Sequence, residues 1–422
     1  DEFVIMSKNE EFDGDKSKWR KTLSFVKGSS LAPPISVDVK LVSMSPKGDT
    51  YAVVREEDET CRLEIWCEGG RCVVPKLTQN AHGKKIYTDN QTGKNSLSLS
   101  LSLSFLTFFL VRPYIFFVHS YIMTTTTTGG LVWCPEGRYV AYVAEKFSQD
   151  KESLATRMYS TTKDDTLDST YDHKFDLGEA YDGRVASDIF VCNVEMMRKG
   201  SMKNVIEKVS MSNRGNFVGD PQLFYNSKSE LCVCYTAWKD EPKTFGLVYC
   251  PIRMSSVMIC TRNAFEKWSE SKSLSSSFKV AHTPRVSPHG DQVVYFASSQ
   301  VPKTHNTVFE LVLCDIKTMC SRVVVKQVSD TLTPSPSDDI SMKEEFAGFY
   351  GCDVPKRVWL DRDHVVYTVN VRSKNRLCRV SLQDDTIEIL YSESNKLTNH
   401  VLLCVSKSHQ KILFMESSIT SR

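Results

Sequence analysis

Polar turns alternate with strand-like runs along most of the chain. Each turn combines Pro, Gly, Asn or Asp, and the run after it is rich in β-branched and aromatic residues. Pro fixes φ and Gly tolerates positive φ, which suits tight turns between strands, and runs of this composition predict strands. The pattern begins five times, at Ser45, Cys134, Asn226, Ser287 and Leu360. The five copies predict a repeated β unit.

Most copies are followed by a second unit of strand, polar turn and strand. Four strands per unit, repeated with long connectors, are typical of the blades of a β-propeller. We therefore predict an all-β fold, a β-propeller of four-stranded blades that is incomplete at one or both ends. The alternative for the same strands is a β-sandwich followed by other β units. The second units are Leu63–Trp66 with Arg71–Leu77, Asp188–Val194 with Asn204–Val209, Phe309–Asp315 with Cys320–Gln327, and Arg376–Leu382 with Thr386–Tyr391.

The strand pattern also predicts the domain boundaries. The propeller is expected over residues 41–415, and residues 1–40 form a segment to which the sequence assigns no structure. Spacing between copies exceeds the ~40–50 residues of compact blades, so long loops are required. The longest is Phe147–Ala186, which is rich in Asp, Ser, Thr and Lys.

A low-complexity block interrupts the predicted propeller. Leu and Ser alternate strictly over Ser96–Ser104, as in a translated CT dinucleotide repeat, and five threonines follow at Thr124–Thr128. We interpret Lys94–Gly129 as a retained intron or an error in the gene model, with a natural low-complexity loop as the alternative. A membrane span is disfavoured, because the apolar run Phe105–Val118 is shorter than the ~20 residues needed to cross a bilayer and contains Arg112-Pro113.

Composition restricts the class of protein. Of the 422 residues, 41% are hydrophobic and 25% are charged, which permits a packed core. The net charge is +2 and the basic residues are spread along the chain, so we predict no nucleic-acid partner. The start at Asp1 has no secretory signal, and its lack of Met indicates a fragment. We predict a cytoplasmic location with no membrane partner.

The cysteines and histidines give no sign of a metal site. Cys232 and Cys234 share one face of an apolar run, and Cys314 and Cys320 bracket a predicted hairpin turn. Without a second pair at short spacing, we interpret them as core thiols in a reducing compartment rather than zinc ligands. His282 and the nearby His289 flank a turn and are expected at solvated positions.

The chain also lacks the motifs of a catalytic site. A nucleophile elbow needs Gly-x-Ser-x-Gly, and no such pentapeptide occurs. Ser271–Ser277 has no flanking glycines and is predicted to be a loop. There is no Walker A loop and no Gly-x-Gly-x-x-Gly. We therefore predict no catalytic, cofactor-binding or metal-binding residue, and no cofactor.

Four pairs of stretches within the predicted blades have a distinctive sequence. They are Leu131–Trp133 with Tyr142–Lys146, Asp176–Glu179 with Asp188–Val191, Trp238–Pro242 with Gly246–Cys250 and Arg253, and Pro284–Pro288 with Val293–Tyr295. These stretches resemble one known family, the acylamino-acid-releasing enzyme (acylaminoacyl-peptidase) of the prolyl-oligopeptidase clan. The similarity is to the N-terminal propeller of that enzyme and runs from about Cys61 to Tyr391, outside the block. In one stretch Leu177 stands where the family usually has Trp.

The resemblance implies a serine hydrolase that removes N-acylated, for example N-acetylated, amino acids from short peptides. In the family a C-terminal α/β-hydrolase domain holds the catalytic triad; that domain is absent from this sequence, so no catalytic residue can be carried over. The propeller would gate substrate access, the full enzyme would be a homo-oligomer, and this part alone would be inactive. The alternatives are a stand-alone propeller that acts as an interaction scaffold, and another member of the clan, such as a dipeptidyl peptidase or an oligopeptidase.

Overall fold

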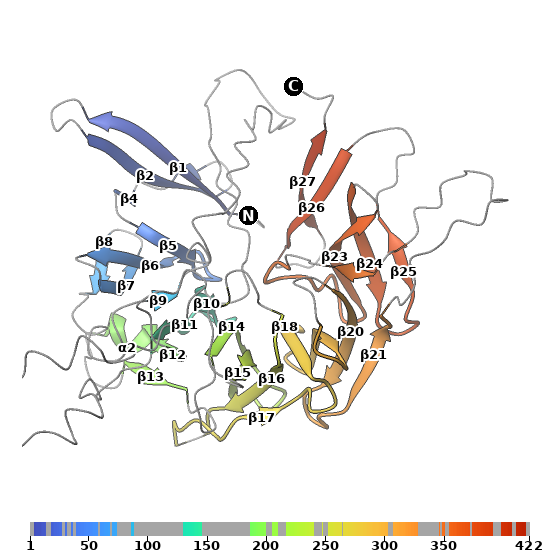
Figure 1. Cartoon of the computed structure of the whole chain (residues 1–422). Coiled ribbons are helices and arrows are strands. Elements are labelled where there is room, and N and C mark those ends of the chain that lie inside the picture. The colour runs from blue at the N-terminus through green and yellow to red at the C-terminus, as the bar shows by residue number, and fades with distance from the viewer. Residues whose placement is uncertain are drawn as a thin grey trace, which may run out of the picture.

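The computed structural model is an all-β chain (Figure 1). The structure describes only some of the residues. These are residues 4–13, 18–27, 30–31, 35–36, 39–57, 60–67, 70–73, 86–87, 130–145, 186–199, 205–209, 217–239, 247, 252–263, 265–302, 307–327, 346, 348–350, 354–371, 374–390, 398–406 and 411–418. The whole block Lys94–Gly129, and the loop Phe147–Ala186 except for Ala186, therefore lie outside the described residues, and both predictions stay untested.

The strands form antiparallel sheets in which neighbours along the chain are usually neighbours in the sheet. The first sheet contains β1 (Val4–Asp13), β2 (Lys18–Lys27), β3 (Ser30–Leu31) and β4 (Ile35–Ser36). The first blade contains β5 (Val39–Met44), β6 (Thr50–Glu57), β7 (Thr60–Cys67) and β8 (Gly70–Val73). The second blade contains β9 (Ile86–Tyr87), β10 (Val132–Trp133), β11 (Tyr139–Glu145), β12 (Ser187–Asn193) and β13 (Ile206–Lys208).

Four further sheets follow the same order. The third blade contains β14 (Phe217–Tyr225), β15 (Leu231–Trp238), β16 (Ser255–Thr261) and β17 (Lys272–Ser273). The fourth contains β18 (Val280–Val286), β19 (Gln292–Ser298), β20 (Val308–Asp315), β21 (Ser321–Val325) and β22 (Phe349–Tyr350). The fifth contains β23 (His364–Val371), β24 (Lys374–Ser381) and β25 (Ile387–Ile389), and the sixth β26 (Thr398–Val405) and β27 (Ile412–Ser418). Figure 1 shows these blades in an arc with the β1–β2 and β26–β27 hairpins at its two ends.

The predicted turns join the first two strands of the blades. The backbone N–H of Ser45 donates to the carbonyl of Thr50 at 2.8 Å, and Ser287 donates in the same way to Gln292 at 2.8 Å. The glycines of three turns have φ of 77°, 72° and 69° at positions 48, 137 and 290. This confirms the expected role of Gly in the left-handed region. A sixth copy joins β26 to β27 with a 2.8 Å bond from the N–H of Ser406 to the carbonyl of Lys411. It was not predicted because its sequence contains no Pro, Gly, Asn or Asp.

Each central blade buries both of its faces. On β15, Val233 and Tyr235 belong to the apolar cluster shared with the second blade, whereas Cys232 and Cys234 belong to the cluster shared with the fourth. Successive strand residues point to opposite faces, so a strand packed between two blades must be apolar at nearly every position. Continuous burial along β15 is the observation that identifies stacked blades, and the predicted β-propeller is confirmed.

Three local features of the fold bear on the sequence predictions. Trp238 is 2% exposed and packs edge-on against Phe217, with ring centroids 6.4 Å apart. The predicted loop Ser271–Ser277 is wrong in part, because β17 pairs with β16 there. The turn between β12 and β13 contains an unpredicted short helix, α2 (Val194–Arg198). No helix in the described part of the chain is long and apolar enough to cross a membrane.

The cysteine predictions are mostly confirmed. Cys232, Cys234 and Cys314 are buried free thiols in the core, and Cys320 is an exposed free thiol. Burial raises the pKa of Cys232 to about 11, which keeps this thiol protonated and unreactive. Cys67 differs because it is disulfide-bonded, to a cysteine whose side chain lies outside the description. Among the described residues, no group of three metal-ligating side chains is placed to hold a metal ion.

Candidate functional site

Two neighbouring strands share an unusual local structure. In β14 the pairing with β15 shifts between Gly219 and Gln222, and in β18 the pairing with β19 shifts between His282 and Arg285. Each bulge contains a proline, at positions 221 and 284, which cannot donate to the ladder. The sequence therefore interrupts both strands at a polar segment.

The residue before each proline has a strained backbone. Asp220 has φ of 48° and Thr283 has φ of 59°. A left-handed conformation is uncommon for any residue with a side chain, and most of all for a β-branched one such as Thr283. The backbone N–H of Thr283 donates to the hydroxyl of Thr236 on β15 at 3.2 Å, which anchors one bulge on the other blade. Such strain persists only where surrounding contacts hold it, and it often marks a functional element.

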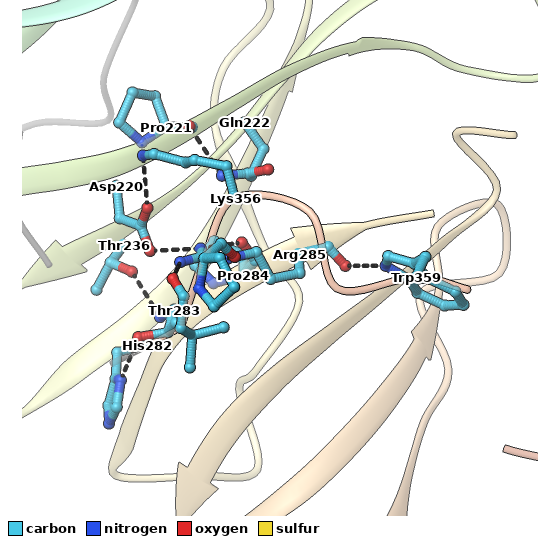
Figure 2. Close-up of polar contacts among 12 residues, drawn as sticks. Asp220, Pro221, Gln222, Thr236, His282, Thr283, Pro284, Arg285, Lys356 and Trp359 are labelled. Atoms are coloured by element: carbon cyan, nitrogen blue, oxygen red, sulfur yellow. Dashed lines mark hydrogen bonds and ion pairs between the residues drawn. The ribbon is translucent and has the colours of Figure 1, made fainter. Parts of the chain in front are cut away.

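Arg285 connects three blades from within the core. Its side chain is 3% exposed, and its Nη1 donates to Oδ2 of Asp220 at 2.7 Å. The same guanidinium donates to the carbonyls of Pro284 at 2.8 Å, of Pro355 at 2.6 Å and of Val354 at 2.6 Å. Four of its five N–H donors are therefore used. Figure 2 shows the guanidinium between the third blade and the segment that leads into the fifth.

Asp220 has a second cationic partner. The ammonium of Lys356 lies 3.0 Å from Oδ1 of Asp220, and the lysine side chain is 25% exposed whereas the aspartate is 2% exposed. Burial disfavours the charged carboxylate, but the charges of Arg285 and Lys356 outweigh it and lower the pKa of Asp220. The group is therefore a carboxylate at neutral pH. We call Asp220, Arg285 and Lys356 the three-blade cluster.

The backbone of Arg285 is also fixed. The indole Nε1 of Trp359 donates to the carbonyl of Arg285 at 3.0 Å (Figure 2). Trp359 is 2% exposed and forms an isolated bridge with Val365 of β23. The side chain and the main chain of one residue thus both contact the fifth blade.

His282 corrects a prediction. Its ring was expected at a solvated position, but it packs edge-on against Phe309, with centroids 4.6 Å apart. Burial lowers the pKa of His282 to about 4; the charge of Asp220 raises it, but the charge of Arg285 opposes that effect. Its Nδ1 pairs with the hydroxyl of Thr283 at 2.8 Å, and its buried Nε2 has no hydrogen-bond partner in the described structure. The nearby His289 is exposed, as predicted.

The cluster contains no catalytic arrangement. Asp220 is a carboxylate locked between two cations, and no serine or cysteine nucleophile with a neighbouring base lies among these residues. What the cluster can do is hold three blades in a fixed relation and present a lysine at its exposed side. Sequence reasoning quoted Pro284–Pro288 as a family-like stretch but assigned Arg285 no role. The available signal was an arginine directly after a proline within a predicted strand.

A second polar region lies between the first two blades. A cavity of about 470 Å³ lies between the turns at Lys47 and Gly137 and helix α2. Arg198 of α2 pairs with Asp49 of the first blade at 3.1 Å, and both side chains are more than a third exposed. Arg138 pairs with Glu195 in the same exposed setting. These charges are paired with one another at the surface, unlike those of the three-blade cluster.

Comparison with known proteins identifies the family. Residues 115–421 match the family model of the N-terminal domain of acylamino-acid-releasing enzyme. The chain belongs to this family. The match starts inside the low-complexity block and continues past Tyr391, beyond the stretches that suggested the resemblance. No curated protein sequence matches the chain.

Solved structures of similar fold include two acylaminoacyl peptidases. One, in complex with Z-Gly-Gly-Phe-chloromethyl ketone, has a TM-score of 0.47 and 12% identity, covering 98% of this chain and 47% of its own. The Pyrococcus horikoshii acylaminoacyl peptidase has a TM-score of 0.44 and 12% identity, covering 95% and 45%. The β-propeller domain of the Trilobed protease from Pyrococcus furiosus has a TM-score of 0.46 and 10% identity, covering 99% and 89%. The chain thus spans less than half of the two peptidases.

Proposed function

We propose that this chain is the access-controlling propeller of a serine peptidase that removes N-acylated amino acids from short peptides. The match to the family model over residues 115–421 carries the proposal. The propeller would occupy residues 41–415 and the hydrolase domain would follow it in the complete enzyme. We expect the nucleophile to come from that hydrolase domain, since this chain contains no Gly-x-Ser-x-Gly motif.

In the proposed mechanism the propeller and the hydrolase domain have separate roles. The hydrolase part would form an acyl-enzyme intermediate with the N-acylated residue. The propeller would act as a lid that admits short, unfolded peptides and excludes folded chains. The three-blade cluster supports this role because it connects the third, fourth and fifth blades through buried ion pairs and hydrogen bonds. Selection of peptides by size requires such a rigid propeller. We also propose that the complete enzyme is cytoplasmic and homo-oligomeric; the free buried thiols suit a reducing compartment.

The proposal is tested with two proteins and one substrate. The chain alone and the complete enzyme that contains it are assayed with an N-acetylated tripeptide. We expect hydrolysis by the complete enzyme, labelling of its nucleophile by a fluorophosphonate, and neither result with the chain alone. Hydrolysis or labelling of the purified chain alone would contradict the proposal, as would a complete enzyme that cleaves only unacylated peptides.

A further inference from the structure

The three-blade cluster carries an unbalanced positive charge. Arg285 and Lys356 contribute two cations, and among the described residues Asp220 is the one carboxylate within salt-bridge distance of either. Nearby His282 is neutral at pH 7, because burial lowers its pKa to about 4. A partly buried net charge is unfavourable unless an opposite charge compensates it. The cluster is therefore electrostatically suited to an anion.

Only one member of the cluster can reach such an anion. Arg285 is 3% exposed and already uses four N–H donors on protein oxygens. Lys356 has three N–H donors, one of which is engaged by Asp220, and a quarter of its side chain is exposed. Figure 2 shows this side chain lying across Asp220 beside Pro221 and Gln222. Two donors of Lys356 are free of partners in the described structure and available to a ligand.

A second lysine forms an ion pair in which the two charges balance. Lys208 of β13 lies 2.6 Å from the buried carboxylate of Asp188, and the two charges sum to zero. Lys356 shares its aspartate with an arginine, so its own charge is not cancelled. Lys208 is therefore the matched control: a lysine on a buried aspartate with no excess charge.

We propose that Lys356 binds a peptide carboxylate, and that this contact selects peptides with a free C-terminus. The inference rests on the proposed function, which makes short peptides the ligands. A carboxylate accepts two charge-assisted hydrogen bonds from an ammonium group. Within the cluster, Asp220 and Arg285 are positioning residues that hold Lys356 beside the strained bulges of β14 and β18.

The test measures binding to the purified chain, not hydrolysis. Acetyl-Ala-Ala-Ala with a free carboxylate is compared with its C-terminal amide by isothermal titration. We expect the acid to bind roughly tenfold more tightly than the amide, as for one hydrogen bond between charged groups. Sodium acetate should compete with the acid. Equal binding of acid and amide by the wild-type chain would overturn the inference without any variant.

Variants assign the effect to one side chain. K356M keeps an apolar stem of similar length, and we expect it to bind acid and amide equally, whereas K356R should restore the preference. K208M should behave as the wild type. Retention of the preference in K356M, or its loss in K208M, would overturn the assignment. Circular dichroism confirms that each variant is folded.

Two further experiments distinguish a C-terminal carboxylate from a side-chain carboxylate, and this inference from the proposed peptidase function. Acetyl-Ala-Glu-Ala amide offers a side-chain carboxylate; if it binds as tightly as the acid, the carboxylate chemistry holds but C-terminal selection is overturned. The complete enzyme is then assayed on the acid and the amide. Preferential binding without any hydrolysis would contradict the proposed function alone, and hydrolysis with equal binding would contradict this inference alone.

Discussion

Two junctions between blades use the same chemistry in opposite settings. Between the third, fourth and fifth blades, Arg285 and Asp220 pair at 2.7 Å with side chains 3% and 2% exposed. Between the first and second blades, Arg198 and Asp49 pair at 3.1 Å with side chains 37% and 40% exposed. Breaking a buried pair costs about 3–5 kcal/mol because one charge is left uncompensated, whereas an exposed pair contributes about 0–1 kcal/mol. An arginine at a blade junction is therefore not by itself evidence of stability.

The difference assigns separate roles to the two halves of the arc. The buried junction also includes the carbonyls of Val354 and Pro355, so Arg285 connects the third and fourth blades to the segment that leads into the fifth. The exposed junction leaves its charges to solvent, and adjacent blades there are joined mainly by their apolar faces. We expect local opening to begin at the first and second blades.

Removing Arg285 should have the largest effect. In Arg285→Met the carboxylate of Asp220 keeps only Lys356, and three carbonyls lose the guanidinium as a donor. We expect a loss of about 3–5 kcal/mol in the free energy of unfolding, measured with urea. Asp220→Asn should cost less in the Arg285→Met background than alone, because the two residues act as a pair. A loss below about 1 kcal/mol would place this junction in the same class as the exposed one.

Glycines at equivalent turns provide a matched pair of substitutions. Gly290 and Gly137 have φ of 69° and 72°, so alanine costs about 1–2 kcal/mol at either. A Cβ at position 290 would lie 1.9 Å from the carbonyl oxygen of Tyr225, whereas at position 137 its nearest neighbour is Ser45 at 3.6 Å. Gly290→Ala should therefore cost a further ~1–3 kcal/mol for the enforced shift. Equal thermal stability of the two variants would show that the buried junction is as adaptable as the exposed one.

The buried junction should also be sensitive to pH. Burial lowers the pKa of His282 to about 4, so between pH 6.5 and about 4 the unfolded chain binds a proton that the folded chain does not. Stability should therefore decrease as the pH is lowered from 6.5 to about 4, by at most about 1.4 kcal/mol per pH unit. His282→Leu should flatten the profile there. The carboxylate of Asp220, whose pKa is lowered, adds stability that is lost only at still lower pH. An unchanged profile in His282→Leu would exclude His282 as the source.

The smallest effect is expected at the exposed junction. Arg198→Ala removes a pair that solvent and salt already screen, so we expect a change below about 1 kcal/mol that disappears near 1 M salt. Thermal melts at low and high salt measure it. A loss as large as that of Arg285→Met would erase the contrast between the two junctions.

Local chemistry explains which parts of the fold could be predicted. Turns with Pro and Gly, and apolar runs after them, fix strand pairs close in sequence, and the turns at Ser45 and Ser287 match their predicted positions. The turn at Ser406 was missed because its sequence has no Pro, Gly, Asn or Asp, although the same type of backbone hydrogen bond closes it. The block Lys94–Gly129 stays a prediction, and sequencing the transcript across it tests whether it is encoded.

The candidate site could not be predicted because its contacts are distant in sequence. Arg285 and Asp220 are 65 residues apart, and Lys356 and Asp220 are 136 apart. Nothing in a strand pattern states which blades are neighbours or that two bulges coincide. His282 was misplaced for the same reason, since Phe309 approaches it from another strand of the blade. Pairs of polar residues flanking prolines in apolar strands were the signal that the sequence contained.

Control of access by peptide length is the central claim, and length dependence tests it most directly. The complete enzyme is given N-acetylated substrates with identical first residues, from a tripeptide to a folded domain with an extended acetylated N-terminus. We expect kcat/KM to fall steeply with length, and the relative cleavage of long substrates to rise in Arg285→Met under conditions where it is folded. Equal kcat/KM at every length, in both proteins, would contradict the account.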